Sequence, residues 1–271
     1  SDNTFSLYSN NTLINSFDTL IIATGGFTFP KTGSKGDGYK LASKMGHSII
    51  TPKVALTGVK VKESALYLLS GLTIENVMVE THKNNWEKGS LLITHEGLSG
   101  PVIINNSRYL NTGDTIRVCF LVDKNNMRRT TKDVQKEMAS LCQSMGKSMF
   151  KTILSTYPLP SSLIEYLLEK NSIDGKKKAS EVGKKSLLAM ASSLTQEPFV
   201  IDLSNMEHKA MVTCGGVSLD EVNIRTMEST LIPRLFFCGE VLDIDGQTGG
   251  YNLQLAWSTG AISGRNAVNN S

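Results

Sequence analysis

The residues best suited to chemistry lie near the end of the sequence, between Cys238 and Gln254. The apolar run before them, residues 235–238, predicts a buried strand that delivers Glu240 just past its carboxyl end. Open α/β sheets bind ligands at that edge. Glu240, or Asp243 a few residues later, would accept hydrogen bonds from the hydroxyl groups of a ribityl or ribose chain.

A glycine pair, Gly249-Gly250, follows and opens a predicted helix. The free N–H groups and positive dipole end of a helix hold a phosphate or stabilise an anionic flavin ring. The alternative is a plain strand–turn–helix connection in which Glu240 and Asp243 only cap the helix. The residues alone do not decide between these two interpretations.

Two histidines are weaker candidates. His95 lies in a turn rich in glycine and serine before a helix expected at Pro101, with Ser99 or Gly100 as its cap. A histidine beside a flavin serves as an acid or as a donor to a substrate carbonyl, whereas a turn histidine bonds only local backbone. The structural role is favoured for His95 and for His47, so His95 is a weak catalytic candidate and no other catalytic residue is assigned.

Composition excludes several classes of protein. The chain has 271 residues, 40% hydrophobic and 20% charged, with a net charge of +3, which is unlike disordered, collagen-like or coiled-coil sequences. No apolar run is long enough to span a bilayer. The four cysteines form no CxxC pair and have no histidine at zinc-ligand spacing, so we expect reduced thiols, no metal site and a cytoplasmic protein without a membrane partner. The oligomeric state stays open. The cysteines are Cys119, Cys142, Cys214 and Cys238.

The pattern of elements predicts one α/β domain interrupted by an insertion. Residues 1–51 and 206–271 carry short apolar runs ended by glycines, typical of strands buried on both faces of a sheet. Residues 52–123 and 196–205 show short strands separated by turns, which favours a small barrel or sandwich. Residues 124–195 show helical spacing with breaks at Pro158 and Gly175, which indicates a helical subdomain.

The helical segment is basic. Residues 124–185 contain 13 Lys and Arg against 6 Asp and Glu, with clusters at 176–178 and 184–185. Such a charge indicates either a nucleic-acid surface or a solvated helical face. Because aromatic residues are nearly absent there and no nucleic-acid motif is present, we favour the solvated face and do not expect a nucleic-acid partner.

Several motifs occur in the order typical of one family. They are Ala23-Thr24-Gly25-Gly26 with Pro30, Gly33-Ser34, Gly36-Asp37-Gly38-Tyr39, Gly46-His47, Thr94-His95-Glu96-Gly97-Leu98-Ser99-Gly100-Pro101, Val212-Thr213, Gly215-Gly216-Val217, Thr226-Met227-Glu228-Ser229, Gly239-Glu240-Val241-Leu242-Asp243 and Thr248-Gly249-Gly250-Tyr251-Asn252-Leu253-Gln254. Over essentially its whole length the chain resembles the HI0933-like flavoproteins, a bacterial family of FAD-dependent oxidoreductases also called YhiN-like or BaiN-like.

The resemblance implies a glutathione-reductase-like FAD-binding domain of the α/β class, here incomplete, interrupted by a β-barrel-like domain that carries a helical subdomain. It implies cofactor-binding roles on both sides of the FAD. On the dinucleotide side these fall to Ala23, Thr24, Gly25 and Gly26. On the ribityl–flavin side they fall to Gly239, Glu240, Asp243, Gly249, Gly250, Tyr251, Asn252, Leu253 and Gln254.

The chain departs from the family at its start. The family begins with a strand, a GxGxxG turn and an acidic residue about twenty positions later, which hold the ADP part of FAD. No such element is present, and residues 33–38 lack a strand at the right distance before them. About the first third of the family's length is missing and the chain does not begin with Met. We therefore expect a fragment or processed piece of a longer protein.

The expected function is FAD-mediated hydride transfer between NAD(P)H and a small organic substrate. Three alternatives stay open. The first is an FAD-dependent oxidase of a small amine. The second is a flavoprotein that binds or modifies tRNA and uses the basic helical segment for it. The third is a flavin-free fragment without catalysis.

Overall fold

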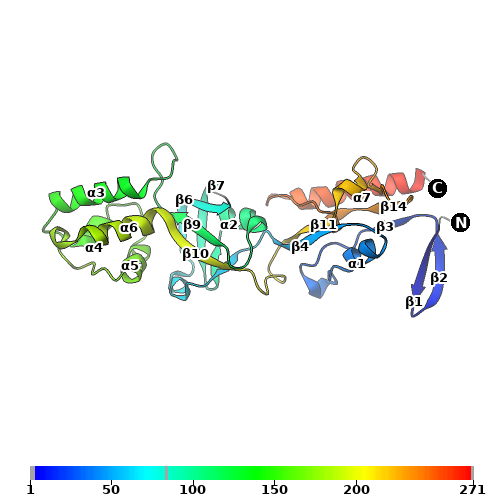
Figure 1. Ribbon diagram of the computed structural model, residues 1–271, viewed down its shortest axis with the longest axis horizontal. Coiled ribbons are helices and arrows are strands. Elements are labelled where there is room, and N and C mark those ends of the chain that lie inside the picture. Colours follow the sequence, from blue (N-terminus) through cyan, green and yellow to red (C-terminus); the bar gives the residue numbers. More distant parts are fainter. Residues whose placement is uncertain (1–3, 83–84, 270–271) are drawn as a thin grey trace. The chain divides into compact units, whose positions relative to one another are not determined.

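The computed structural model describes residues 4–82 and 85–269. The chain forms two compact units (Figure 1). Unit 1 contains Ser1–Thr57 and Asn205–Ser271, and unit 2 contains Gly58–Ser204. Among the described residues, no helix combines the length and the apolar character that crossing a membrane requires.

A four-stranded sheet forms the centre of unit 1, in the order β12-β13-β14-β3. Strands β14 (Leu235–Phe237) and β3 (Leu20–Ile22) run parallel, with Leu235 opposite Leu20 and Phe237 opposite Ile22. All of β14 is buried, because apolar side chains on both of its faces contact the core. Both apolar runs form strands as predicted, but the expected burial on both faces is wrong for β3, where Ile21 is 38% exposed. The sheet is completed by β12 (Val222–Asn223) and β13 (Glu228–Ser229).

Two helices accompany this sheet. Helix α7 (Tyr251–Asn269) packs on β14 and β3, and helix α1 (Asp37–Lys44) buries Tyr39 and Ala42. Helix α1 begins at Asp37. The chain enters it through Gly36, whose left-handed φ of 74° places Asp37 in the first turn.

The rest of unit 1 consists of two antiparallel pairs. Strands β4 (Ile49–Ala55) and β11 (Val212–Val217) pair with a register shift between Cys214 and Gly216. A Cβ atom on Gly215 would lie 2.6 Å from the carbonyl oxygen of Thr51, so only glycine fits the shift. The second pair is a hairpin of β1 (Phe5–Ser9) and β2 (Thr12–Phe17).

Unit 2 contains a closed six-stranded barrel in the order β10-β5-β8-β7-β6-β9. The barrel-like expectation is therefore confirmed for this part of the chain. At Gly97 a Cβ atom would overlap the carbonyl oxygen of Val59, so two strands approach closely there. The strands are β5 (Val59–Val61), β6 (Thr73–His82), β7 (Asn85–Thr94), β8 (Gly97–Ser99), β9 (Thr115–Cys119) and β10 (Glu197–Asp202).

The same unit contains the helices expected from the sequence. Thr130 caps α3, where its hydroxyl accepts a hydrogen bond from the backbone N–H of Asp133 at 3.2 Å. Gly100, rather than Ser99, is the cap residue of α2. The helix before the predicted break at Pro158, α4, is only five residues long. The helices are α2 (Pro101–Asn106), α3 (Thr131–Ser144), α4 (Phe150–Leu154), α5 (Ser161–Lys170) and α6 (Lys184–Gln196).

Candidate functional site

A pocket of about 380 Å³ lies in unit 1 at the N-terminus of α7. Its wall is mainly apolar and includes Leu56, Met211, Ile244 and Leu253. Its polar lining residues are Glu240, Gln247, Thr248 and Asn252, next to the glycine pair Gly249-Gly250. A mostly apolar hollow with a few convergent polar groups is typical of cofactor and small-molecule sites.

The start of α7 is open. Gly249 and Gly250 have φ values of 125° and 87°, which side chains other than glycine rarely adopt. A Cβ atom on Gly250 would meet nothing within 4 Å. The space beside Gly250 is therefore uncrowded, and an anionic edge of a ligand placed there would lie at the positive dipole end of α7.

Asn252 holds the loop before α7 in place. Its Oδ1 accepts a hydrogen bond from the N–H of Gly246, and its Nδ2 donates one to the Gly246 carbonyl oxygen, both at 2.9 Å. The side-chain amide therefore closes the loop from Gly246 to Gly250. In this arrangement Asn252 positions the glycine pair, a role that the sequence motif does not reveal.

Glu240 joins three segments of unit 1. Its Oε1 accepts a hydrogen bond from the backbone N–H of Thr213 at 2.7 Å, and Thr213 Oγ1 accepts one from the N–H of Phe27 at 3.0 Å. A Cβ atom on Gly26 would overlap Thr213 Oγ1 and Glu240 Oε1 and would lie 2.7 Å from Thr213 Cβ. The glycine at position 26 is therefore needed for this packing. Thr213 belongs to the motif Val212-Thr213, which by itself assigns no role to this side chain.

Tyr39 supports the same cluster. Its hydroxyl donates a hydrogen bond to the carbonyl oxygen of Glu240 at 3.4 Å. Burial, with a smaller contribution from the charge of Glu240, raises the pKa of Tyr39 to about 12. The phenol therefore stays protonated and donates at physiological pH. Beside it, a Cβ atom on Gly38 would overlap Thr24 Oγ1, so α1 packs directly on the residue 23–26 segment.

The other predicted cofactor residues lie outside the pocket lining. Residues 23–26 pack beneath Glu240 and Thr213, and Gly239 donates its N–H to Thr259 Oγ1 at 2.9 Å. The N–H of Asp243 is bonded to the Val217 carbonyl. Tyr251 is 64% exposed, and Gln254 donates to Ser258. The structure thus gathers Glu240, Gly249, Gly250, Asn252 and Leu253 at one pocket.

His95 lies on the surface of unit 2. It is in the turn between β7 and β8, its side chain is 80% exposed, and its Nε2 is 3.8 Å from Glu96 Oε1. It is not among the residues that line the 440 Å³ cavity of that unit described below. Its catalytic role stays a prediction.

His47 is buried in unit 1 between two partners. Its Nε2 is 2.9 Å from Ser229 Oγ, and its Nδ1 is 3.3 Å from Glu221 Oε2. Ser229 Oγ already accepts hydrogen bonds from the N–H groups of Leu231 and Ile232. Its own proton is therefore donated to Nε2, which places the imidazole proton on Nδ1, facing Glu221. The arrangement is that of a structural histidine.

This burial predicts a pH dependence of stability. Burial lowers the pKa of His47 from its ordinary value of 6.5, and Glu221 opposes that shift only in part. The unfolded chain takes up a proton at this side chain more readily, so the stability that His47 contributes is present above about pH 6.5 and is lost as the pH falls further. We expect His47→Gln to flatten the decrease in Tm between pH 7 and pH 5. An unchanged slope would contradict this assignment.

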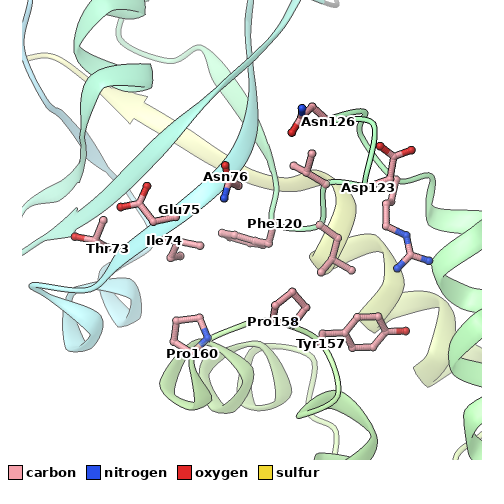
Figure 2. Close-up of a pocket in the computed structure, with 13 residues that line it drawn as sticks. Thr73, Ile74, Glu75, Asn76, Phe120, Asp123, Asn126, Tyr157, Pro158 and Pro160 are labelled. Atoms are coloured by element: carbon pink, nitrogen blue, oxygen red, sulfur yellow. The ribbon is translucent and has the colours of Figure 1, made fainter.

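A second cavity, of about 440 Å³, lies within unit 2 (Figure 2). The start of β6, the segment after β9 and the loop after α4 surround it. Figure 2 shows Phe120, Pro158 and Pro160 on its apolar side and Asn76 and Asp123 on its polar side. None of the residues predicted from the sequence to bind a cofactor lines this cavity.

Metal-ligating groups do not cluster in the part of the chain that the structure describes. Across residues 4–82 and 85–269, no three His, Cys, Asp or Glu side chains lie together as a metal site would require. All four cysteines lie in the part of the chain that the structure describes, where they are buried and form no disulfide. Burial raises the pKa of the Cys238 thiol, which does not favour a reactive thiolate.

Comparison with known proteins identifies related sequences. A family described as the HI0933-like protein Rossmann domain matches residues 1–266. A ribosomal RNA dihydrouridine synthase of Haemophilus influenzae is 31% identical over 242 residues, which cover 89% of this chain and 58% of that protein. The enzyme of the same name from Escherichia coli is 29% identical over 245 residues, covering 89% and 58%.

A relative with a different substrate matches equally well. The 3-dehydro-bile acid delta(4,6)-reductase of Clostridium scindens is 31% identical over 269 residues, which cover 93% of this chain and 62% of that protein. The chain therefore spans less than two thirds of the length of each of these three relatives.

Proposed function

The chain belongs to the HI0933-like family, and from that premise we propose that it forms the part of a flavoprotein oxidoreductase that holds the flavin ring. The observation that carries the proposal is the pocket at the N-terminus of α7. It combines an apolar wall with the open glycine pair Gly249-Gly250. A flat apolar ring system with one electron-rich edge is the ligand that suits such a pocket.

The pocket fits a flavin ring but not a whole FAD. The residues around it supply an apolar wall, the dipole of α7 and the carboxylate of Glu240. No glycine-rich turn for the ADP half is present in the sequence. We propose that the ADP half, where FAD is the cofactor, is held by residues outside this chain.

We propose that the reaction is the reduction of a carbon–carbon double bond conjugated to a carbonyl group. Making dihydrouridine saturates the ring double bond of uridine, which is conjugated to a carbonyl. The name delta(4,6)-reductase implies a 3-dehydro bile acid substrate. In that substrate a carbon–carbon double bond is likewise conjugated to the 3-oxo group. Both reactions add a hydride and a proton, and the bound flavin supplies the hydride. NAD(P)H is the proposed source of the electrons.

The residues of the chain have three tasks in this proposal. The apolar wall, including Leu56 and Met211, excludes water from the ring. The first turn of α7 would stabilise negative charge at the ring edge through the positive end of the helix dipole, because a Cβ atom on Gly250 would meet nothing within 4 Å and the space beside the helix start is uncrowded. Glu240 is fixed by Thr213, so its carboxylate keeps one position beside the pocket and can accept a hydrogen bond from a ribityl hydroxyl.

Two classes of substrate are compatible with this reaction. A uridine within RNA is favoured, because two of the three relatives described above are named ribosomal RNA dihydrouridine synthases and the helical part of unit 2 is strongly basic. A small conjugated ketone is the second candidate, supported by the bile acid reductase. None of these three relatives is named as an oxidase.

The proposal that this pocket binds the flavin can be tested by placing an aspartate at one of two positions of α7. Leu253 lines the pocket, and Ala261 is exposed on α7 away from it. Leu253→Asp puts a carboxylate where the flavin edge should lie. Because an acid in the first turn of a helix does not oppose the helix dipole, this change should not destabilise α7. We expect the full-length protein to lose most of its co-purified flavin, measured by its absorbance near 450 nm, in Leu253→Asp only.

Ala261→Asp is the matched control, because it adds the same charge to the same helix. The circular dichroism spectra of both variants should match the wild type. Equal flavin content in Leu253→Asp and the wild type would exclude this pocket as the flavin site.

A further inference from the structure

Six exposed lysines come together in unit 2 from three segments of the chain. We call them the lysine surface, which consists of Lys147, Lys176, Lys177, Lys178, Lys184 and Lys185. The segment after α3 and the segment before α6 lie side by side. The N–H of Phe150 donates to the Lys177 carbonyl at 2.9 Å, and the N–H of Ala179 donates to the Ser148 carbonyl at 2.8 Å.

The start of α6 lies beside α3, which brings the third segment close. Gln135 Nε2 on α3 donates to the carbonyl oxygen of Lys184 at 3.4 Å, and the N–H of Ser180 donates to the Gly146 carbonyl at 3.1 Å. Lys184 and Lys185 therefore join the lysines of the two paired segments. Lysines that are up to 38 positions apart in the sequence share one end of the helical region.

The charge of this surface is largely uncompensated. Elsewhere in the helical region, Arg129, Lys151 and Lys170 form ion pairs with Glu137, Glu165 and Glu197. Across residues 4–82 and 85–269, none of the six lysines forms an ion pair with an acid. Of the two acids nearest in sequence, Asp174 accepts the backbone N–H of Lys176 at 2.9 Å and Glu181 is exposed.

We propose that the lysine surface binds the phosphate backbone of the RNA that carries the substrate uridine, an inference that rests on the proposed function. Lysine ammonium groups are point charges that bind phosphate oxygens without reading the sequence. Six such exposed groups on neighbouring segments match the repeated charge of a nucleic-acid strand. The lysine surface offers no aromatic ring on which a base could stack. We therefore assign to it the positioning of the RNA, and we assign recognition of the base to another site.

A membrane surface suits these lysines less well. Interfacial helices need an unoccupied apolar face to enter the bilayer. Three large apolar residues of α6 are not available for such a face. Leu187, Met190 and Leu194 are 5% exposed or less and belong to the core of unit 2. Near the lysines, the large apolar side chains that remain exposed are Met149 and Leu188, at 55% and 49%. Two such side chains do not form a continuous apolar face.

The proposal predicts a change in the salt dependence of RNA binding. Each phosphate contact that is lost lowers the slope of log K against log salt by about 0.7 to 0.9. We expect the triple variant K176S/K177S/K178S of the full-length protein to lower this slope by about 2 and to bind roughly tenfold or more weakly near 0.1 M salt. The probe is a fluorescently labelled uridine 20-mer, followed by anisotropy from 50 to 200 mM KCl.

Two control variants test whether RNA binding depends on the lysine surface rather than on the net charge of the protein. K31S/K44S/K62S removes the same charge from three exposed lysines elsewhere and should leave the slope within about 0.5 of the wild type. K176R/K177R/K178R keeps the charge and should keep the binding. The proposal is overturned if both serine triples weaken binding equally, if the wild type does not bind the RNA, or if the serine variant instead loses binding to phosphatidylserine vesicles while RNA binding is unchanged.

Failure of this proposal can be told apart from failure of the proposed function. If the full-length protein contains flavin and reduces a conjugated ketone but does not bind the RNA, the lysine surface is wrong and the reductase proposal stands. If the RNA binds with the expected slope while the protein contains no flavin, the lysine surface stands and the reductase proposal is wrong.

Discussion

Gly26→Ala is expected to lower the free energy of unfolding by about 3 kcal/mol, the upper end of the cost of inserting a methyl group into a packed core. The added Cβ atom would overlap Thr213 Oγ1 and Glu240 Oε1. Neither atom can move freely, because the Thr213 N–H is bonded to Glu240 and Thr213 Oγ1 is bonded to the N–H of Phe27. Chemical denaturation followed by circular dichroism measures the effect.

Gly260→Ala is the matched control in the same unit. A Cβ atom on Gly260 would meet nothing within 4 Å, and alanine is favoured over glycine inside a helix by about 0.5 to 1 kcal/mol. This variant should therefore be slightly more stable than the wild type. If Gly26→Ala is as stable as Gly260→Ala, the described packing of residue 26 against Glu240 is wrong.

The second large effect is expected from Lys170→Ala. Lys170 forms an ion pair with Glu197, whose side chain is only 1% exposed where α6 passes into β10. Removing the lysine leaves a buried carboxylate without its cation, which costs about 3 to 5 kcal/mol. Glu197→Gln should cost less, because the side chain of Lys170 is 32% exposed and can reach water.

Lys151→Ala provides the comparison for an exposed ion pair. The side chains of Lys151 and Glu165 are 42% and 55% exposed, and such pairs contribute about 0 to 1 kcal/mol. The two alanine variants therefore differ in the burial of the acid that they leave behind. Equal losses of stability in Lys170→Ala and Lys151→Ala would contradict the burial of Glu197.

Local sequence patterns predict much of the fold. The short apolar runs that end at Ala23 and Gly239 indicate buried strands, and β3 and β14 lie there. The alternation of short strands and turns indicates a small barrel or sandwich, and the strands close into a barrel. The parallel pairing of β3 with β14 and the closure of the barrel depend on contacts between distant residues, which no local pattern specifies.

The site shows the same division. The glycine pair before α7 indicates an open helix start, and Gly250 has that geometry. Thr213, by contrast, becomes part of the site only because β11 lies against the segment after β14. Asn252 belongs to the motif, yet both of its side-chain bonds go to Gly246, so a motif position alone does not separate a ligand-binding residue from one that holds a loop.

The proposed function requires that the pocket at the N-terminus of α7 holds a flavin ring. The most direct test is a titration of FMN and of FAD with the chain 1–271, followed by flavin fluorescence. Because the residues at hand offer contacts to the ring and the ribityl chain but no glycine-rich turn for ADP, both flavins should bind saturably, with dissociation constants within about threefold, or 0.7 kcal/mol, of each other. Saturable binding of neither flavin would contradict the account.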